Sequence, residues 1–310
     1  MIPEDKSARP NYSPFDDPVV SACFASVETA GKAIQSLSNS VTRKDGVVIA
    51  EVTSVTPQAY SAIPGERGTR VDVRSKSTAN QMIILEVNMY TAKNIAQRNL
   101  LAAAQIFTST SAANTTHHQM AVNMPFVIAI NILDYHIRTD NDEWLQPAKF
   151  VYTKPPHTVA LPQYASYDII IPAFRLAPPD WDDDLYCWVY ALVKAHDERR
   201  TVKEVVNMVT ELKPFALKNE GFRQFAERYE FVATSEELRN DYLNWQREVM
   251  RQQGMLEAAE EKGVERGREQ GREQGREQGR EQGINALINE LIKMGMPIDY
   301  LNKARANVAD

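Results

Sequence analysis

Cysteine is scarce in this chain of 310 residues, which contains only Cys23 and Cys187. The two lie far apart and lack the spacing of metal ligands, which excludes a disulfide framework and a cysteine-based zinc site. No apolar run is as long as a membrane-spanning helix requires, and the first residues lack the apolar core of a secretory signal. We therefore expect a soluble, cytoplasmic protein without a membrane partner.

Net positive charge is also lacking, because 41 acidic residues outweigh 35 lysines and arginines to give a formal charge of −6. A chain of this charge has no bulk attraction for nucleic acid, so contact with a polyanion would depend on a local basic patch. Hydrophobic residues make up 43% of the chain, which is enough for a sizeable core. Disorder is therefore not expected to dominate.

The first 140 residues alternate between helical and strand patterns. Apolar residues recur at helical spacing over 17–37, which predicts one amphipathic helix, and the composition of 93–109 predicts a second helix. The apolar run 126–133 is typical of a strand covered on both faces. Strand composition predicts three further strands, the last two forming a hairpin, at 47–55, 69–74 and 81–90. The order α-β-β-β-α-β predicts an α/β fold in which helices flank a mixed sheet.

The rest of the chain divides into three parts. Frequent prolines mark 141–180 as an edge elaboration or connector, with short strands expected at 149–153 and 167–174. Residues 181–262 are expected to be mostly helical, beginning with a helix that has Asp182, Asp183 and Asp184 at its N-terminus, where negative charge is favoured. The last part, 263–310, is a tail with a repeat.

The repeat in this tail is Gly-Arg-Glu-Gln, which occurs four times over 267–283 and closes on a further glycine. In a helix all five glycines fall on one slowly winding stripe, and Glu residues meet an Arg three residues on, as Glu269 meets Arg272 and Glu273 meets Arg276. We expect a long helix over 251–294 that pairs with copies of itself, because a glycine stripe allows close approach of a second backbone. A solvated spacer stays open as the alternative, since these residue types bury little apolar area.

Two acidic residues share one face of the predicted hairpin. Asp72 projects from the polar face of the first arm, and Glu86 and Asn88 project together from the polar face of the second. With the turn centred near Ala79, Asp72 and Glu86 are directly opposed, with Cβ atoms about 5 Å apart. Paired carboxylates repel unless they share a proton or bind a cation, and oxygen ligands suit Mg²⁺ or Mn²⁺.

The surroundings of this pair are basic. Between residues 67 and 98 Asp72 and Glu86 are the only acidic residues, whereas Arg67, Arg70, Arg74, Lys76, Lys93 and Arg98 are basic. The stretch thus has a net charge of +4 within a chain of −6, which favours a phosphate-bearing partner. Candidate nucleic-acid contacts are Arg67, Arg70, Arg74, Lys76 and Lys93.

Several short segments together resemble the recombination-promoting nuclease family, also described as PD-(D/E)XK transposase-like. They are Asp17-x-x-Val20-x-x-x-Phe24, Arg70-Val71-Asp72-Val73, Leu85-Glu86-Val87-Asn88, Arg98 and the run from Pro125 to Tyr135, and the glycine-charge repeat is also typical of the family. The resemblance implies a restriction-endonuclease-like core that cleaves DNA phosphodiesters with Mg²⁺ or Mn²⁺. It also implies a link to DNA recombination, mobile elements or phage defence.

The resemblance implies roles for five residues. Asp72 and Glu86 are implied as the metal ligands, and Asn88 as the residue that positions the attacking water. Arg98 or Arg74 would offset charge that develops on the phosphate, although Arg98 has the alternative role of pairing with an acid on a neighbouring helix.

Two departures from the family pattern leave a second function open. Asn88 stands where the family usually has Gln and the superfamily Lys, and Ser21 stands where the family usually has Lys. The second function is that of a catalytically silent nuclease fold that serves nucleic-acid binding or protein assembly.

In the nuclease, Glu28 and Asp17 are candidates for a third acidic ligand of the metal.

Overall fold

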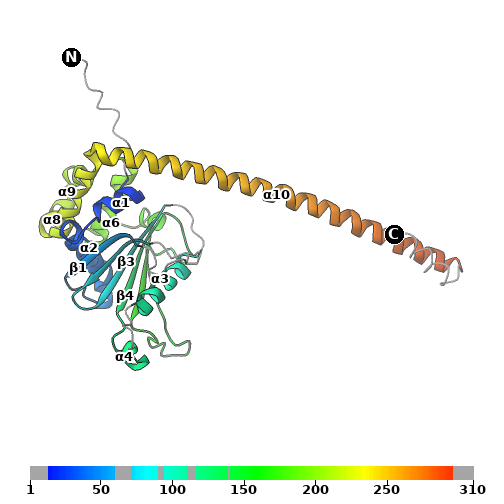
Figure 1. The fold of residues 1–310 in the computed structure, drawn as a ribbon, viewed down its shortest axis with the longest axis horizontal. Coiled ribbons are helices and arrows are strands. Elements are labelled where there is room, and N and C mark those ends of the chain that lie inside the picture. Colours follow the sequence, from blue (N-terminus) through cyan, green and yellow to red (C-terminus); the bar gives the residue numbers. More distant parts are fainter. Residues whose placement is uncertain (1–12, 60–70, 90–93, 110–115, 139, 296–310) are drawn as a thin grey trace, which may run out of the picture. The chain divides into compact units, whose positions relative to one another are not determined.

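The computed structural model describes residues 13–59, 71–89, 94–109, 116–138 and 140–295 (Figure 1). The chain divides into two compact units, residues 1–243 and 244–310. A six-stranded sheet with helices on both faces forms the first unit, and the described part of the second is mostly one long helix. Among the described residues, no helix combines the length and the apolar character needed to cross a membrane.

The sheet is mixed, with the strand order β1-β2-β3-β4-β6-β5. Its strands are β1 (Val52–Ala59), β2 (Val71–Ser77), β3 (Gln81–Asn88), β4 (Phe126–Leu133), β5 (Leu145–Lys149) and β6 (Tyr164–Ile170). The first three strands are antiparallel neighbours, β3, β4 and β6 run parallel, and β5 is antiparallel to β6. The architecture is that of a restriction-endonuclease-like α/β fold, as predicted.

Helices cover both faces of this sheet. The helices of the described residues are α1 (Asp17–Cys23), α2 (Val27–Thr42), the short 3-10 helix η2 (Arg43–Asp45), α3 (Ile95–Ser109), α4 (His117–Val122), α5 (Ile171–Phe174), α6 (Asp184–Asp197), α7 (Val202–Met208), α8 (Leu212–Lys218), α9 (Glu220–Thr234) and α10 (Glu236–Lys293), most of which belongs to the second unit. Helix α3 lies on one side of the sheet, whereas α2, α6, α8 and α9 gather on the other (Figure 1). The predicted helix after Trp181 is confirmed as α6, in which Asp183 caps the first turn.

The crossover from β3 through α3 to β4 builds one side of the core. Small and aliphatic residues of α3, Ala102, Ala103 and Ile106, pack against Ile84 and Ala129 of the two strands. Burying this apolar stripe places α3 flat on the sheet and makes β3 and β4 parallel neighbours, as the crossover predicted.

The single helix expected over 17–37 is wrong, because the structure has two helices there. Helix α1 stops at Cys23, and Ser26 takes an extended conformation (φ −149°, ψ 167°) at the N-cap of α2, a position that serine favours. Both helices bury apolar residues, so the spacing of apolar residues continues across the break. Periodicity alone therefore does not reveal it.

The start of the first strand was also predicted wrongly, since β1 begins at Val52 rather than at residue 47. Side chains take the place of a partner strand before it. The Asn39 side chain accepts from Ile49 N–H, and the Gln81 side chain accepts from Ala50 N–H and donates to Val48 C=O. These bonds satisfy the backbone of a segment that reads as strand by composition.

Residues 141–180 contribute more to the sheet than an edge elaboration. The expected strand at 149–153 lies instead at Leu145–Lys149, and the expected strand at 167–174 is divided between β6 and α5. Strand β6 is buried along its whole length between β4 and β5. The sheet therefore runs beyond the boundary expected near residue 140.

Candidate active site

The β2–β3 hairpin brings Asp72 and Glu86 together. Its register pairs Val73 with Leu85, which places Asp72 opposite Glu86 one position further along. The Asp72 N–H donates to Glu86 Oε2 at 3.3 Å, and the Val87 N–H donates to Asp72 Oδ2 at 2.7 Å. Each carboxylate therefore accepts a hydrogen bond from the backbone of the opposite strand. The hairpin alone thus fixes the position of the pair.

Glu86 is almost completely buried, with 4% of its surface exposed, whereas Asp72 is half-buried. A buried carboxylate is costly unless a cation or hydrogen bonds compensate it. Here Glu86 Oε1 accepts a hydrogen bond from Arg98 Nη2, and Arg98 projects from the first turn of α3. Arg98 thus pairs with a carboxylate of the predicted pair.

A row of polar side chains continues from Glu86 across the sheet. In the parallel register Glu86 pairs with Asn131 of β4, and Asn131 pairs with Asp168 of β6. On the other side of Asp168, Gln146 of β5 is its antiparallel partner. These four residues are buried in the face that α3 covers, where their neighbours are mainly apolar. Sequence reasoning missed all of the row beyond Glu86.

The middle of this row is connected to α3 by hydrogen bonds. Asn99 Nδ2 donates to Asn131 Oδ1 at 3.0 Å, and Asn131 Nδ2 donates to Asp168 Oδ1. Burial raises the pKa of Asp168 above its ordinary value, and the hydrogen bond from Asn131 lowers it only in part. Asn99 follows Arg98 directly in α3, so one turn of helix contacts two members of the row.

The other predicted site residues lie on the same hairpin or outside the described residues. Asn88 is the half-buried last residue of β3, two positions beyond Glu86 and on the same face. Arg74 is half-buried and Lys76 is exposed, and both alternate with the buried residues of β2 as Asp72 does. Arg67, Arg70 and Lys93 lie outside the described residues.

Among the described side chains, no third acidic ligand lies with the pair. Glu28 is exposed in the first turn of α2, where the Ser26 hydroxyl and the Glu28 backbone hold the pKa of its carboxyl below the usual value. The side chain of Asp17 lies outside the described set. Within that set no three His, Cys, Asp or Glu side chains gather closely enough to hold a metal ion.

The carboxylate pair nevertheless fits a hard divalent cation by the chemistry of its donors. Mg²⁺ in proteins is bound through one or two carboxylates, and water and substrate phosphate complete its shell. Asp72 and Glu86 offer two such carboxylates on adjacent strands, and the positive charge now beside Glu86 is that of Arg98. The pair is therefore suited to a cation that shares its shell with a phosphate.

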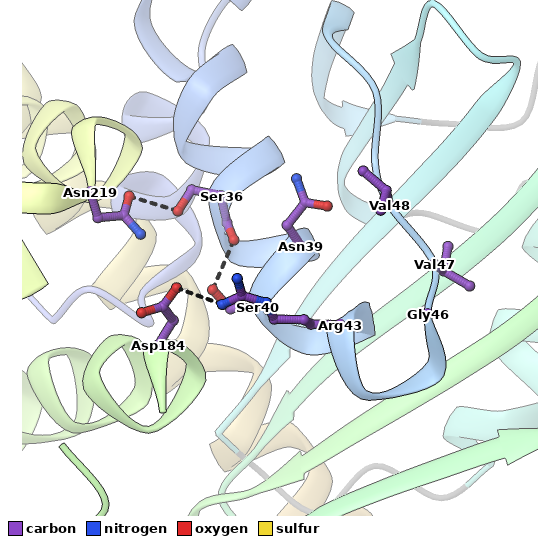
Figure 2. A pocket seen from close by; sticks show the side chains of 9 residues that line it. All are labelled: Ser36, Asn39, Ser40, Arg43, Gly46, Val47, Val48, Asp184 and Asn219. Carbon is purple, nitrogen blue, oxygen red and sulfur yellow. Dashed lines mark hydrogen bonds and ion pairs between the residues drawn. The ribbon is translucent and has the colours of Figure 1, made fainter. Parts of the chain in front are cut away.

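A cavity of about 330 Å³ lies elsewhere, between α2 and the N-terminus of α6 (Figure 2). Its lining residues are Ser36, Asn39, Ser40, Arg43, Gly46, Val47, Val48, Asp184 and Asn219. Figure 2 shows Ser36 turned toward Asn219, to which it donates at 2.7 Å, and Arg43 turned toward Asp184. These polar groups join helices to one another, and neither carboxylate of the pair lines the cavity.

The chain was compared with curated proteins, solved structures and protein families. No curated protein and no solved structure matches the chain. A family model described as PD-(D/E)XK nuclease family transposase matches residues 17–259, which include the hairpin, α3 and the whole sheet. Since this match covers most of the sequence and the fold agrees with it, the chain belongs to the PD-(D/E)XK nuclease transposase family.

Proposed function

We propose that this chain is a DNA endonuclease that depends on Mg²⁺ or Mn²⁺ and hydrolyses phosphodiester bonds, with a role in DNA recombination or phage defence. Membership of the family supports a nuclease-type function. The observation that carries the finer proposal is the opposition of Asp72 and Glu86 across the hairpin, with Arg98 in contact with Glu86. Two carboxylates and a guanidinium form a suitable arrangement for a metal-bound phosphate.

Each residue of the site has a distinct role in this proposal. Asp72 and Glu86 hold the cation through their carboxylate oxygens. The chemistry that a bound ion supplies is neutralisation of the phosphate charge and a lower pKa for an attacking water. Asn88, on the same face as Glu86, orients this water through its side-chain amide. Arg98 places positive charge beside Glu86, where charge on the phosphate increases during attack.

Binding of DNA follows from the local charge of the hairpin. Arg74 and Lys76 lie on β2 on the same face as Asp72, and Arg67, Arg70 and Lys93 belong to the same basic stretch of sequence. Phosphate contacts from such residues lend affinity that falls as salt rises and is insensitive to base sequence. DNA is therefore the proposed substrate.

A catalytically silent scaffold is the second candidate. Two observations favour it: Asn88 is shorter than the Gln or Lys expected there, and Arg98 already contacts one of the two carboxylates. In this case the nuclease fold would act in nucleic-acid binding or assembly. Activity on DNA separates the two candidates directly.

The first prediction is that purified full-length protein converts supercoiled plasmid to nicked and linear forms with Mg²⁺ or Mn²⁺. Excess EDTA should stop the conversion, because the carboxylate pair alone does not activate water. Agarose gels read the result. If neither the natural chain nor its Asn88→Gln and Asn88→Lys variants cut with any divalent metal, the scaffold function holds instead.

The second prediction concerns self-association through α10, which we also propose. In this helix added Cβ atoms at Gly267, Gly271, Gly275, Gly279 and Gly283 would meet no atom within 4 Å, so the glycine stripe is open. Light scattering should show a larger oligomer for the full chain than for a chain ending at Arg251. Replacing the five glycines by alanine should favour the helix by about 1 kcal/mol each and still weaken association, because the stripe is filled. An unchanged oligomeric state in both variants would contradict the proposal.

A further inference from the structure

The three polar residues Asn99, Asn131 and Asp168 are buried where apolar residues would be expected. Their exposed fractions are 2%, 0% and 8%, and Ala103, Ala129 and Tyr164 pack in the same interior. Burying amide and carboxyl groups contributes little net stability, and apolar residues of similar volume often stabilise as well or better. These side chains therefore have a role in orienting the elements that they join, and not in stability alone.

Apart from these residues and the ion pair of Arg98 with Glu86, the contact between α3 and the sheet is mainly apolar. It is made largely by small or aliphatic residues such as Ala102, Ala103 and Ile106. Apolar burial is not directional, so it allows small shifts of a helix over a sheet. The hydrogen bond from Asn99 Nδ2 to Asn131 Oδ1 is satisfied in one position of the helix only.

Asp168 determines which way the Asn131 amide faces. The NH₂ group of Asn131 donates to Asp168 Oδ1, so the amide nitrogen points toward this carboxyl group. The carbonyl oxygen of the same amide then points toward α3, where Asn99 donates to it. The chain of donors runs from helix to carboxylate without a mismatch, and each member orients the next.

The position of Asn99 decides the position of Arg98, because the two are consecutive residues of α3. Arg98 contacts Glu86 on β3, and Asn99 contacts Asn131 on the neighbouring strand β4. We infer that Asn99, Asn131 and Asp168 are positioning residues, whose hydrogen-bond chain holds α3 in register and so holds Arg98 against Glu86. The consequence for metal binding rests on the proposed function, whereas the position of Arg98 does not.

The first test measures Mn²⁺ affinity of full-length protein by titration calorimetry, together with thermal unfolding. Asn131→Leu should weaken Mn²⁺ binding about tenfold, the lower end of losses seen when outer partners of metal ligands are removed. The matched control is Tyr167→Phe, which removes the 2.6 Å hydrogen bond from Tyr167 to Asp45 on the opposite face of β6, next to Asp168. This control should lower Tm without changing Mn²⁺ affinity, and equal losses of affinity in both variants would overturn the inference.

A triple variant, Asn99→Leu with Asn131→Leu and Asp168→Leu, separates position from stability. Replacing all three by apolar residues leaves none of their hydrogen-bonding groups unpaired, so Tm should recover relative to Asn131→Leu. Mn²⁺ affinity should stay about tenfold weaker than in the natural chain. Recovery of both would show that the network only stabilises the fold. If the triple variant does not fold, Asp168→Asn gives the same decision, because it keeps the shape but no longer orients the Asn131 amide.

A second readout needs no metal. Arg98→Met and Glu86→Gln, made singly and together, form a double-mutant cycle in Tm. In the natural background the two losses should be non-additive, and in the Asn131→Leu background they should add, because Arg98 no longer meets Glu86. Non-additivity in both backgrounds would overturn the inference. If the natural chain binds no Mn²⁺, the proposed function fails and this cycle alone decides the positioning role.

Discussion

Replacing Glu86 with glutamine should lower Mg²⁺-dependent DNA cleavage on the order of a thousandfold, because a metal ligand supplies several kcal/mol of transition-state stabilisation. Asp72→Asn should have an effect of the same size, since each carboxylate is one of two across the hairpin. Rates of plasmid nicking under saturating Mg²⁺ provide the measurement. Circular dichroism should show that both variants retain the fold, because glutamine and asparagine keep the shape of the original side chains.

The control for this experiment is Asp197→Asn. Asp197 also pairs with an arginine, Arg175, but it lies at the end of α6 and is no part of the carboxylate pair. The Asp197→Asn variant should cut DNA at the rate of the natural chain. Undiminished cleavage by Glu86→Gln or Asp72→Asn would remove the assignment of metal ligands.

Replacing Gly221 with alanine should destabilise the first unit by about 3 kcal/mol, which lowers Tm by roughly 6–12 °C for a domain of this size. An added Cβ would lie 2.2 Å from the carbonyl oxygen of Lys32 and 2.7 Å from the Cβ of Ser36. Both of these atoms belong to α2 and one is backbone, so α9 must move away from α2 to make room. Thermal unfolding followed by circular dichroism measures the effect.

Gly254→Ala is the matched control, because the same change is made in a helix where no atom lies within 4 Å of the added Cβ. There alanine should leave the Tm of the first unit unchanged and favour the helix by about 1 kcal/mol. A Gly221→Ala variant that melts like the natural chain would mean that α9 does not approach the α2 backbone this closely.

The carboxylate pair was accessible from sequence because every step that defines it is local. Strand parity places Asp72 and Glu86 on the polar faces of two arms, and a single turn between Ser77 and Gln81 fixes the register. The apolar run Phe126–Leu133 is equally local and was predicted with its observed bounds. Local pattern and global fold agree at these positions.

The rest of the polar row could not be predicted from the sequence, because it forms only when β6 inserts between β4 and β5. Asp168 joins Asn131 only when β6 pairs with β4, and no local pattern indicates that a later strand lies between β4 and β5. Asn131 itself left a signal, as the one polar residue in an apolar strand. A polar residue in such a strand requires a partner, and its identity comes from tertiary structure.

The position of β6 between β4 and β5 also affects the order in which the sheet can form during synthesis of the chain. At about 5–20 residues per second, a ribosome completes β6 a few seconds after β4. During this interval one edge of β4 has no partner strand, and such an edge can pair with another nascent chain. Asn131 interrupts the otherwise apolar β4, and a polar residue in such a segment opposes aggregation. The residue that orients α3 in the folded protein thus also protects the unfinished one.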